Sequence, residues 1–171
     1  MKRRYRPDEA LPAYRYVPGG AHPHPRNDDD GHMRHRAPLP SKGSELAWMV
    51  DAAWLYGVDL FNRWYFWEAH EVWEPVWKGL DKASPPGVFV QGLMQCAGAL
   101  LKVHIGEMEG VLAFWGQAEV RLGQVARASP ELFGLKTKAT FKDFERYFRP
   151  AVVKGRLPCL DKAVPQLKLR M

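Results

Sequence analysis

Cysteine is scarce in this sequence of 171 residues, and long apolar runs are missing. The only two cysteines, Cys96 and Cys159, lie in unlike surroundings, which excludes a disulfide framework and a zinc-binding cysteine cluster and indicates a reducing compartment. Charged or polar residues interrupt each apolar stretch before the roughly 20 residues that a membrane-spanning helix needs. The basic start lacks the apolar segment of a secretory signal. We therefore expect a cytoplasmic protein with no membrane partner.

Positive charge is concentrated toward the two ends of the chain. Residues 1–43 hold nine Lys and Arg against five Asp and Glu, and residues 134–171 hold ten against three. The middle, residues 44–133, holds six against eleven and is acidic. Two interpretations stay open: the basic ends lie on the acidic centre, or they reach toward an acidic partner such as nucleic acid.

Residues 1–43 are expected to form an irregular basic arm. Seven prolines, the Gly19-Gly20 pair and the acidic run before Gly31 are incompatible with long helices or central strands. Four of the six histidines of the chain lie in this arm. They form either a metal-binding tract or a polar extended segment. These histidines are His22, His24, His32 and His35.

Apolar residues recur at spacings of three and four from Ser44 onward, which predicts an all-α fold. We expect a compact bundle of about four to five helices over residues 44–155, followed by a basic extended tail over 156–171. No convincing alternating pattern predicts strands. The expected helices cover residues 44–62, with Ser44 as N-cap and Leu46, Met49 and Val50 inward, then 64–78, 86–105, 108–127 and 140–155.

The sequence Ala-His-Glu-Val-Trp-Glu at positions 69–74 is the main candidate for a functional site. On a helix, His70 and Glu74 share a face, and Glu71 lies on its flank, at the border of a tryptophan-rich apolar face. Such ionisable groups are costly to bury unless they pair, bind a ligand or react. Glu68 is expected to point to solvent.

Three hypotheses fit this cluster. In the first, His70 and Glu74 ligate a divalent metal ion, with His104 or a histidine of the arm as the missing third ligand. In the second, the site performs metal-free acid/base chemistry, because two carboxylates close together and bordered by Trp side chains raise the pKa of one of them. In the third, the cluster is a polar network within the core.

The predicted third helix, residues 86–105, is apolar nearly all round, with a narrow polar stripe. Gln91, Gln95 and Lys102 form this stripe, and they could fix the polar atoms of a substrate or an anion. We expect the stripe to face the His70 cluster and to form a polar cleft with it. His104 lies on the apolar flank of the same helix, where a buried core histidine is more common than a metal ligand.

Together these segments resemble the domain-of-unknown-function family 309. The resemblance rests on Leu-Phe-Asn at 60–62, which includes Asn62, on the Ala-His-Glu-x-x-Glu helix, on Gln-Gly-x-x-Gln at 91–95, and on Leu-Lys-Val-His at 101–104. It runs roughly from residue 50 to 125. It implies a small all-α fold with a cleft between the two motif helices, with Asn62 among its binding residues. It implies no activity.

Two function classes follow from the sequence. One is a small-molecule-binding or hydrolase-like protein, with Glu71 or Glu74 as base and His70 as acid or ligand. The other is a non-enzymatic interaction module, in which basic ends bind nucleic acid or an acidic protein and the His/Glu cluster is structural.

Overall fold

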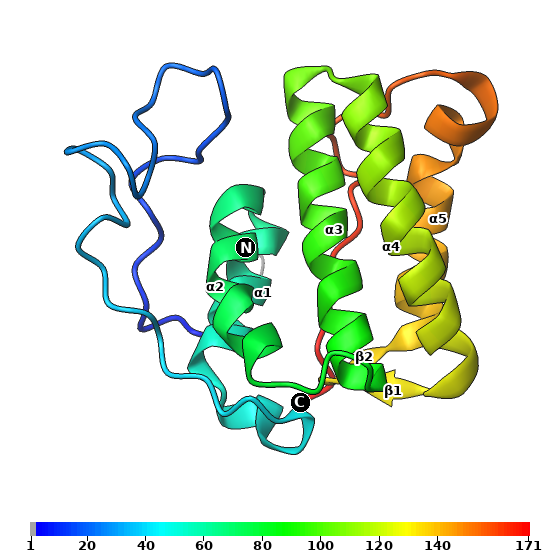
Figure 1. Ribbon diagram of the computed structural model, residues 1–171, viewed down its shortest axis with the longest axis horizontal. Coiled ribbons are helices and arrows are strands. Elements are labelled where there is room, and N and C mark those ends of the chain that lie inside the picture. The colour runs from blue at the N-terminus through cyan, green and yellow to red at the C-terminus, as the bar shows by residue number, and fades with distance from the viewer. Residues whose placement is uncertain (1–2) are drawn as a thin grey trace.

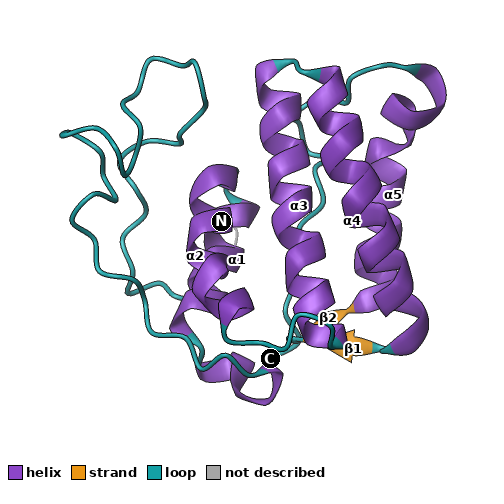
Figure 2. Cartoon of the chain, in the orientation of Figure 1, coloured by secondary structure: helices purple, strands orange, loops and turns teal. Residues whose placement is uncertain are grey.

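The computed structural model describes residues 3–171 and is built almost wholly of helices (Figures 1 and 2). An irregular arm, residues 3–44, precedes the first helix, and a tail from residue 155 follows the last one. The all-α prediction is confirmed. The elements in chain order are η1 (Glu45–Val50), α1 (Ala52–Asn62), α2 (Phe66–Lys78), α3 (Pro85–Ile105), α4 (Met108–Ala128), β1 (Glu131–Leu132), β2 (Leu135–Lys136) and α5 (Thr137–Lys154).

Each helix from α1 to α5 packs mainly against the next one in the chain, with α3 in the middle (Figure 1). The arm lies on the side of α1 and α2, away from α5. By length and composition α3 could cross a membrane, contrary to the expectation that each apolar stretch is too short. Its place between α2 and α4, with most of its side chains buried, is that of a central core helix.

Aromatic side chains fill the core where α1 and α2 meet. Trp54 stacks on Trp73 at a centroid distance of 5.6 Å, and Phe61 also stacks on Trp73, at 5.8 Å. Trp73 donates its indole N–H to the backbone oxygen of Trp54 at 3.2 Å. This pairing satisfies a buried donor without using the predicted carboxylates of α2.

The first predicted helix is divided into two at Asp51. This buried carboxylate accepts the backbone N–H of Trp54, so it caps α1 in place of Ser44, which makes no side-chain cap bond. Asp51 also binds Ser41 and the backbone N–H of Lys42, which ties the end of the arm to the helix. The preceding turn, η1, is 3₁₀-helical. Three predicted inward residues are consequently exposed: Leu46, Met49 and Val50.

A short hairpin between α4 and α5 was not expected from the sequence. Its two-residue turn, Phe133 and Gly134, has positive φ at both positions, as a tight hairpin turn requires. α5 follows directly and begins at Thr137, three residues earlier than predicted.

The tail folds back onto the core. From Leu167 to Arg170 its side chains alternate, with both leucines buried and Lys168 and Arg170 exposed. Asn62 on α1 donates to the backbone oxygen of Leu167 and accepts its N–H, both at 2.8 Å. The tail therefore contributes to the core with one side and presents positive charge with the other.

Candidate functional site

The three predicted acid/base residues of α2 have separate surroundings. Arg26 of the arm binds Glu71 at 2.6 Å, whereas Lys78 lies 3.0 Å from Glu74. His70 remains 44% exposed, and its Nδ1 is 4.0 Å from the nearer oxygen of Glu71. Burial lowers the pKa of His70, and the charges of Glu71 and Glu74 oppose that shift. Both carboxylates thus have a basic partner on the surface.

The predicted glutamine stripe of α3 is directed to α4. Gln91 accepts from the guanidinium of Arg121 at 3.1 Å, and Gln95 donates to Gln117 at 2.8 Å. Lys102 pairs with Glu107, which directly precedes α4. Within residues 3–171, no hydrogen bond or ion pair joins the stripe to the α2 cluster. The expected cleft between the two motif helices is therefore not formed by these contacts.

Two further predicted site residues lie elsewhere. Asn62 is buried and holds Leu167 of the tail by the two hydrogen bonds described above. His104 is exposed in the last turn of α3, not buried on an apolar flank. Its pKa is lowered by partial burial and by the nearby charge of Arg15.

The metal hypothesis lacks a complete ligand set in the structure. Among the residues described, no group of three His, Cys, Asp or Glu side chains is arranged to hold a metal ion. His70 and Glu74 share a face of α2, but neither His104 nor an arm histidine completes a site with them. We therefore assign no metal ligand.

Glu68, expected to point to solvent, is completely buried. One carboxylate oxygen accepts the backbone N–H of Tyr16 in the arm at 2.9 Å, and the other has no hydrogen-bond partner among the residues described. Burial raises the pKa of Glu68 to about 7, although the Tyr16 N–H and the charge of Arg15 act in the opposite direction. The perturbed carboxyl of α2 is thus Glu68.

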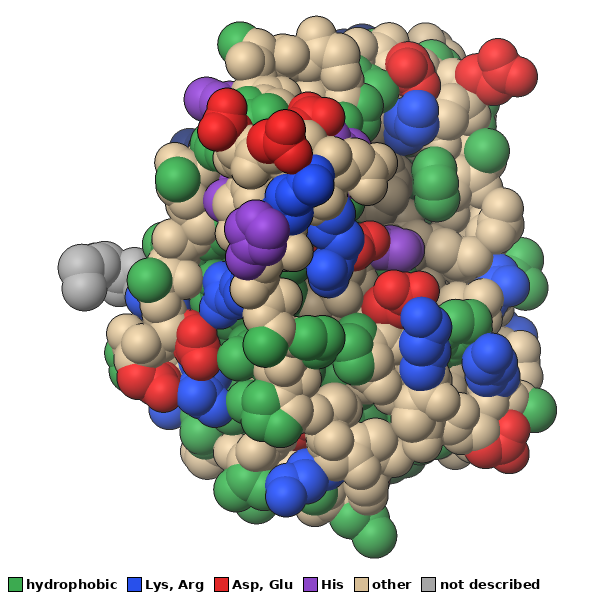
Figure 3. All heavy atoms as spheres, turned by 60° about the vertical axis from the view of Figure 1, so that its left-hand side comes forward, with side chains coloured by type: hydrophobic (Ala, Val, Ile, Leu, Met, Phe, Trp, Pro, Cys, Tyr) green, Lys and Arg blue, Asp and Glu red, His purple; other side chains and the backbone are tan. Residues whose placement is uncertain are grey.

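Histidines and tyrosines of the arm cover Glu68. His32 Nε2 lies 3.4 Å from Glu68 Oε1, and the ring of Tyr14 contacts both His32 and His22. Figure 3 faces this side of the molecule, where histidine, basic and acidic side chains are interspersed. The signal in the sequence that the arm packs on the helices was its set of tyrosines and histidines, because aromatic side chains bury apolar surface against a neighbour. The sequence left open whether the arm lies on the helices, and it did not indicate that the arm would cover Glu68.

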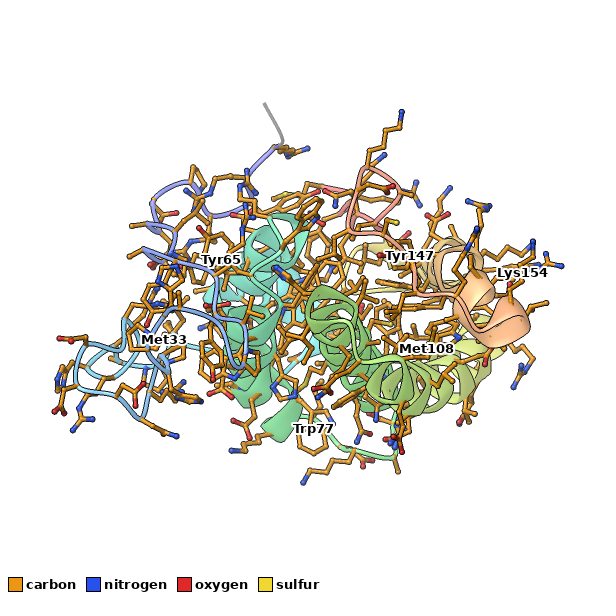
Figure 4. All side chains as sticks on the ribbon, turned by 90° about the horizontal axis from the view of Figure 1, so that it is seen from above. Met33, Tyr65, Trp77, Met108, Tyr147 and Lys154 are labelled. Atoms are coloured by element: carbon orange, nitrogen blue, oxygen red, sulfur yellow. The ribbon has the colours of Figure 1, made fainter. Side chains whose placement is uncertain are left out.

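A basic groove lies on the opposite side of the molecule, between α5 and the tail. In Figure 4, Met33 of the arm and Lys154 of α5 mark these opposite sides. The groove has a volume of about 1020 Å³. Its lining includes two acidic residues, Asp143 and Asp161, and six basic ones: Lys136, Arg146, Arg156, Lys162, Lys168 and Arg170.

Most positive charge around this basic groove is uncompensated. Within residues 134–171, Arg146 pairs with Asp143 and Arg170 pairs with Glu131. The other eight Lys and Arg of that segment make no ion pair in the described chain, and all are exposed. Four of the eight line the groove itself: Lys136 just before α5, and Arg156, Lys162 and Lys168 in the tail. Such an arrangement produces a positive potential that attracts anions.

The comparisons with known proteins give one match. No curated protein and no solved structure matches the chain. One family model, described as "Domain of unknown function (DUF309)", matches residues 54–113. That range covers the α1–α2 core, α3 and the start of α4, and it excludes the arm, α5 and the basic groove. The resemblance inferred from the sequence is confirmed: this chain contains a DUF309 segment over residues 54–113.

Proposed function

We propose that this protein is an interaction module that binds the phosphate backbone of nucleic acid in the basic groove between α5 and the tail. The observation that carries the proposal is the lining of this one groove, where six basic residues stand against two acidic ones and four of the six make no ion pair among residues 3–171: Lys136, Arg156, Lys162 and Lys168. Each cation that meets a phosphate releases a counterion, so several of them together give substantial affinity.

The side chains that line the groove favour contact with the phosphate backbone of a nucleic acid over contact with its bases. Among its lining residues the one aromatic side chain is Tyr147, which is 8% exposed and donates its hydroxyl to the backbone of Cys159. A surface without exposed aromatic rings offers no platform for stacking of bases. Binding is therefore expected to depend on phosphate charge and to differ little between sequences.

The α2 cluster supports the interaction class over acid/base catalysis. Glu71 and Glu74 are each paired with a basic side chain, Arg26 and Lys78. The expected catalytic cleft also required the α3 stripe beside them, and within residues 3–171 the stripe makes its hydrogen bonds and ion pair elsewhere. The predicted small-molecule or hydrolase-like activity consequently has less geometric support than the basic groove.

The test is the affinity for fluorescein-labelled 20-nucleotide single strands and duplexes, measured by anisotropy at 100 mM salt. The variant Arg156→Ala/Lys162→Ala/Lys168→Ala removes three charges from the tail wall. We expect it to bind about 10-fold more weakly or worse. The tail is not deleted, because Leu167 and Leu169 belong to the core.

The control variant Lys42→Ala/Lys78→Ala/Lys82→Ala removes the same charge from exposed positions outside the groove. Its affinity should stay within about threefold of the wild type. Equal weakening of both variants, or no binding by the wild type at 50 mM salt, would overturn the proposal. Binding of poly-glutamate in place of nucleic acid would assign an acidic protein partner instead and also overturn it.

A further inference from the structure

Three buried polar atoms without hydrogen-bond partners meet at the contact between the arm and α2. Within residues 3–171 these are both ring nitrogens of His32 and one carboxylate oxygen of Glu68. The side chain of His32 is 10% exposed, and that of Glu68 is 0% exposed. Unpartnered polar atoms are rare in folded proteins, and several at one place call for an explanation.

A proton shared by the two side chains would give a partner to one of these three atoms, His32 Nε2. The nearest atoms of the two side chains, His32 Nε2 and Glu68 Oε1, are 3.4 Å apart. With one proton between them, the pair is either two neutral groups or an imidazolium beside a carboxylate. With no proton, Glu68 is a buried anion, and with two protons, His32 is a buried cation. Both of these states are costly in the docked arm.

The charged groups around the pair do not remove this cost. Arg15 is the charge that acts on Glu68, and it also lies over the rings of Trp64 and Tyr65. Arg36 and His22 act on His32 and oppose its protonation. On α2, Glu71 is engaged by Arg26, and on α3 the charge of Arg15 also acts on His104.

The same carboxyl holds the arm in place. The Tyr16 N–H donates to Glu68, and the ring of Tyr16 packs edge-on against Trp67 at a centroid distance of 5.4 Å. His24 contacts both rings, and Tyr14 contacts His32. We propose that Glu68 and His32 form a proton-sharing latch, so that docking of the N-terminal arm on α2 depends on pH in the neutral range.

The sign of the dependence follows from linkage. The pKa of Glu68 is raised from 4.5 to about 7 in the docked state, so docking takes up a proton there, weakens as the pH rises toward 7 and levels off above it. The pKa of His32 is lowered by burial, so this group opposes docking only below its ordinary pKa of about 6.5. From pH 6 to 8, Glu68 alone should weaken docking about tenfold, and His32 should reduce this change.

The test is the backbone amide of Tyr16 in the full chain, followed by NMR between pH 5 and 8.5. We expect its chemical shift to titrate with a midpoint near the pKa of Glu68, and the heteronuclear NOE of the arm to fall as the pH rises. In Glu68→Gln this titration should vanish. In that variant the heteronuclear NOE of the arm should instead rise with pH. His32 is then the only member of the pair that can titrate, and its protonation at low pH opposes docking.

Glu71→Gln is the matched control, since Glu71 also binds the arm but through the exposed Arg26. In Glu71→Gln the chemical shift of the Tyr16 amide should still titrate as in the wild type. His32→Asn should steepen the loss of docking with rising pH. A Tyr16 amide that does not titrate, or one that titrates equally in Glu68→Gln, would overturn the latch. These outcomes are independent of nucleic-acid binding in the basic groove.

Discussion

The side chain of Asn62 and the backbone of Leu167 form two hydrogen bonds of 2.8 Å across 105 positions of the chain. This amide completes the backbone pairing of the tail as a neighbouring strand would. Asp59, also buried on α1, accepts the backbone N–H groups of Tyr5 and Arg6 in the same way. Buried polar side chains of α1 and α2 thus attach both ends of the chain to the helices.

Replacing Asn62 with alanine tests this role. Asn62→Ala leaves the N–H and C=O of Leu167 buried without partners, so the free energy of unfolding should fall by about 2–4 kcal/mol. Urea denaturation monitored by tryptophan fluorescence measures it. Gln166→Ala should cost under about 0.5 kcal/mol, because this neighbouring side chain bonds, within residues 3–171, only to Pro165 at 3.4 Å. Equal costs would argue against the attachment role.

A glycine at the α1–α2 contact allows Trp73 to approach the helix. A Cβ added at Gly57 would lie 2.1 Å from the indole nitrogen of Trp73, which is closer than any real contact. Gly57→Ala should therefore destabilise the fold by about 3 kcal/mol or more, as overpacking of a core does. Thermal unfolding gives the value.

Gly116 on α4 is the matched control, because a Cβ there meets nothing within 4 Å. Gly116→Ala should stabilise the protein by about 0.5–1 kcal/mol through helix propensity. If Gly57→Ala were equally harmless, the described packing of Trp73 against α1 would be wrong.

Burial of Glu68 predicts a pH dependence of global stability. Its folded pKa of about 7 lies above the ordinary value of 4.5, so its favourable contribution is complete at low pH and is lost as the pH rises to 7. The stability of Glu68→Gln relative to the wild type should therefore increase from pH 5 to pH 8. The increase should reach up to about 3 kcal/mol.

Urea denaturation at both pH values provides this comparison. Glu74→Gln, which changes a 39% exposed carboxylate on the same helix, should show no comparable increase. A difference between Glu68→Gln and wild type that is the same at pH 5 and pH 8 would contradict the raised pKa.

Periodicity was sufficient to predict the helices, because α1 to α5 bury apolar faces at spacings of three and four. The start of α3 has a local signal, because Ser84 stands directly before two prolines, and its hydroxyl accepts the N–H of Gly87. The break at Asp51 was missed, since an aspartate inside an apolar stripe gives no local sign of its contacts with the arm. The hairpin at Phe133 was also missed, because two-residue strands are too short to show alternation.

The candidate site could be predicted only in part. The α2 motif was correctly identified as a place where ionisable groups meet an apolar face, but the buried member is Glu68. Its burial depends on Tyr16 and His32, which are 52 and 36 positions away and lie in an arm without periodicity. The tail was expected to be extended and basic, yet the burial of its leucines depends on Asn62. Long-range partners of irregular segments leave no local pattern.

The salt dependence of nucleic-acid binding tests the central claim most directly. Log K for a labelled 20-mer is plotted against log salt concentration for the wild type and for Arg156→Ala/Lys162→Ala/Lys168→Ala. If those three cations contact phosphates in the basic groove, the slope should become shallower by about 2 to 3 in the variant. An unchanged slope, or a wild-type affinity that does not depend on salt, would contradict the proposed function.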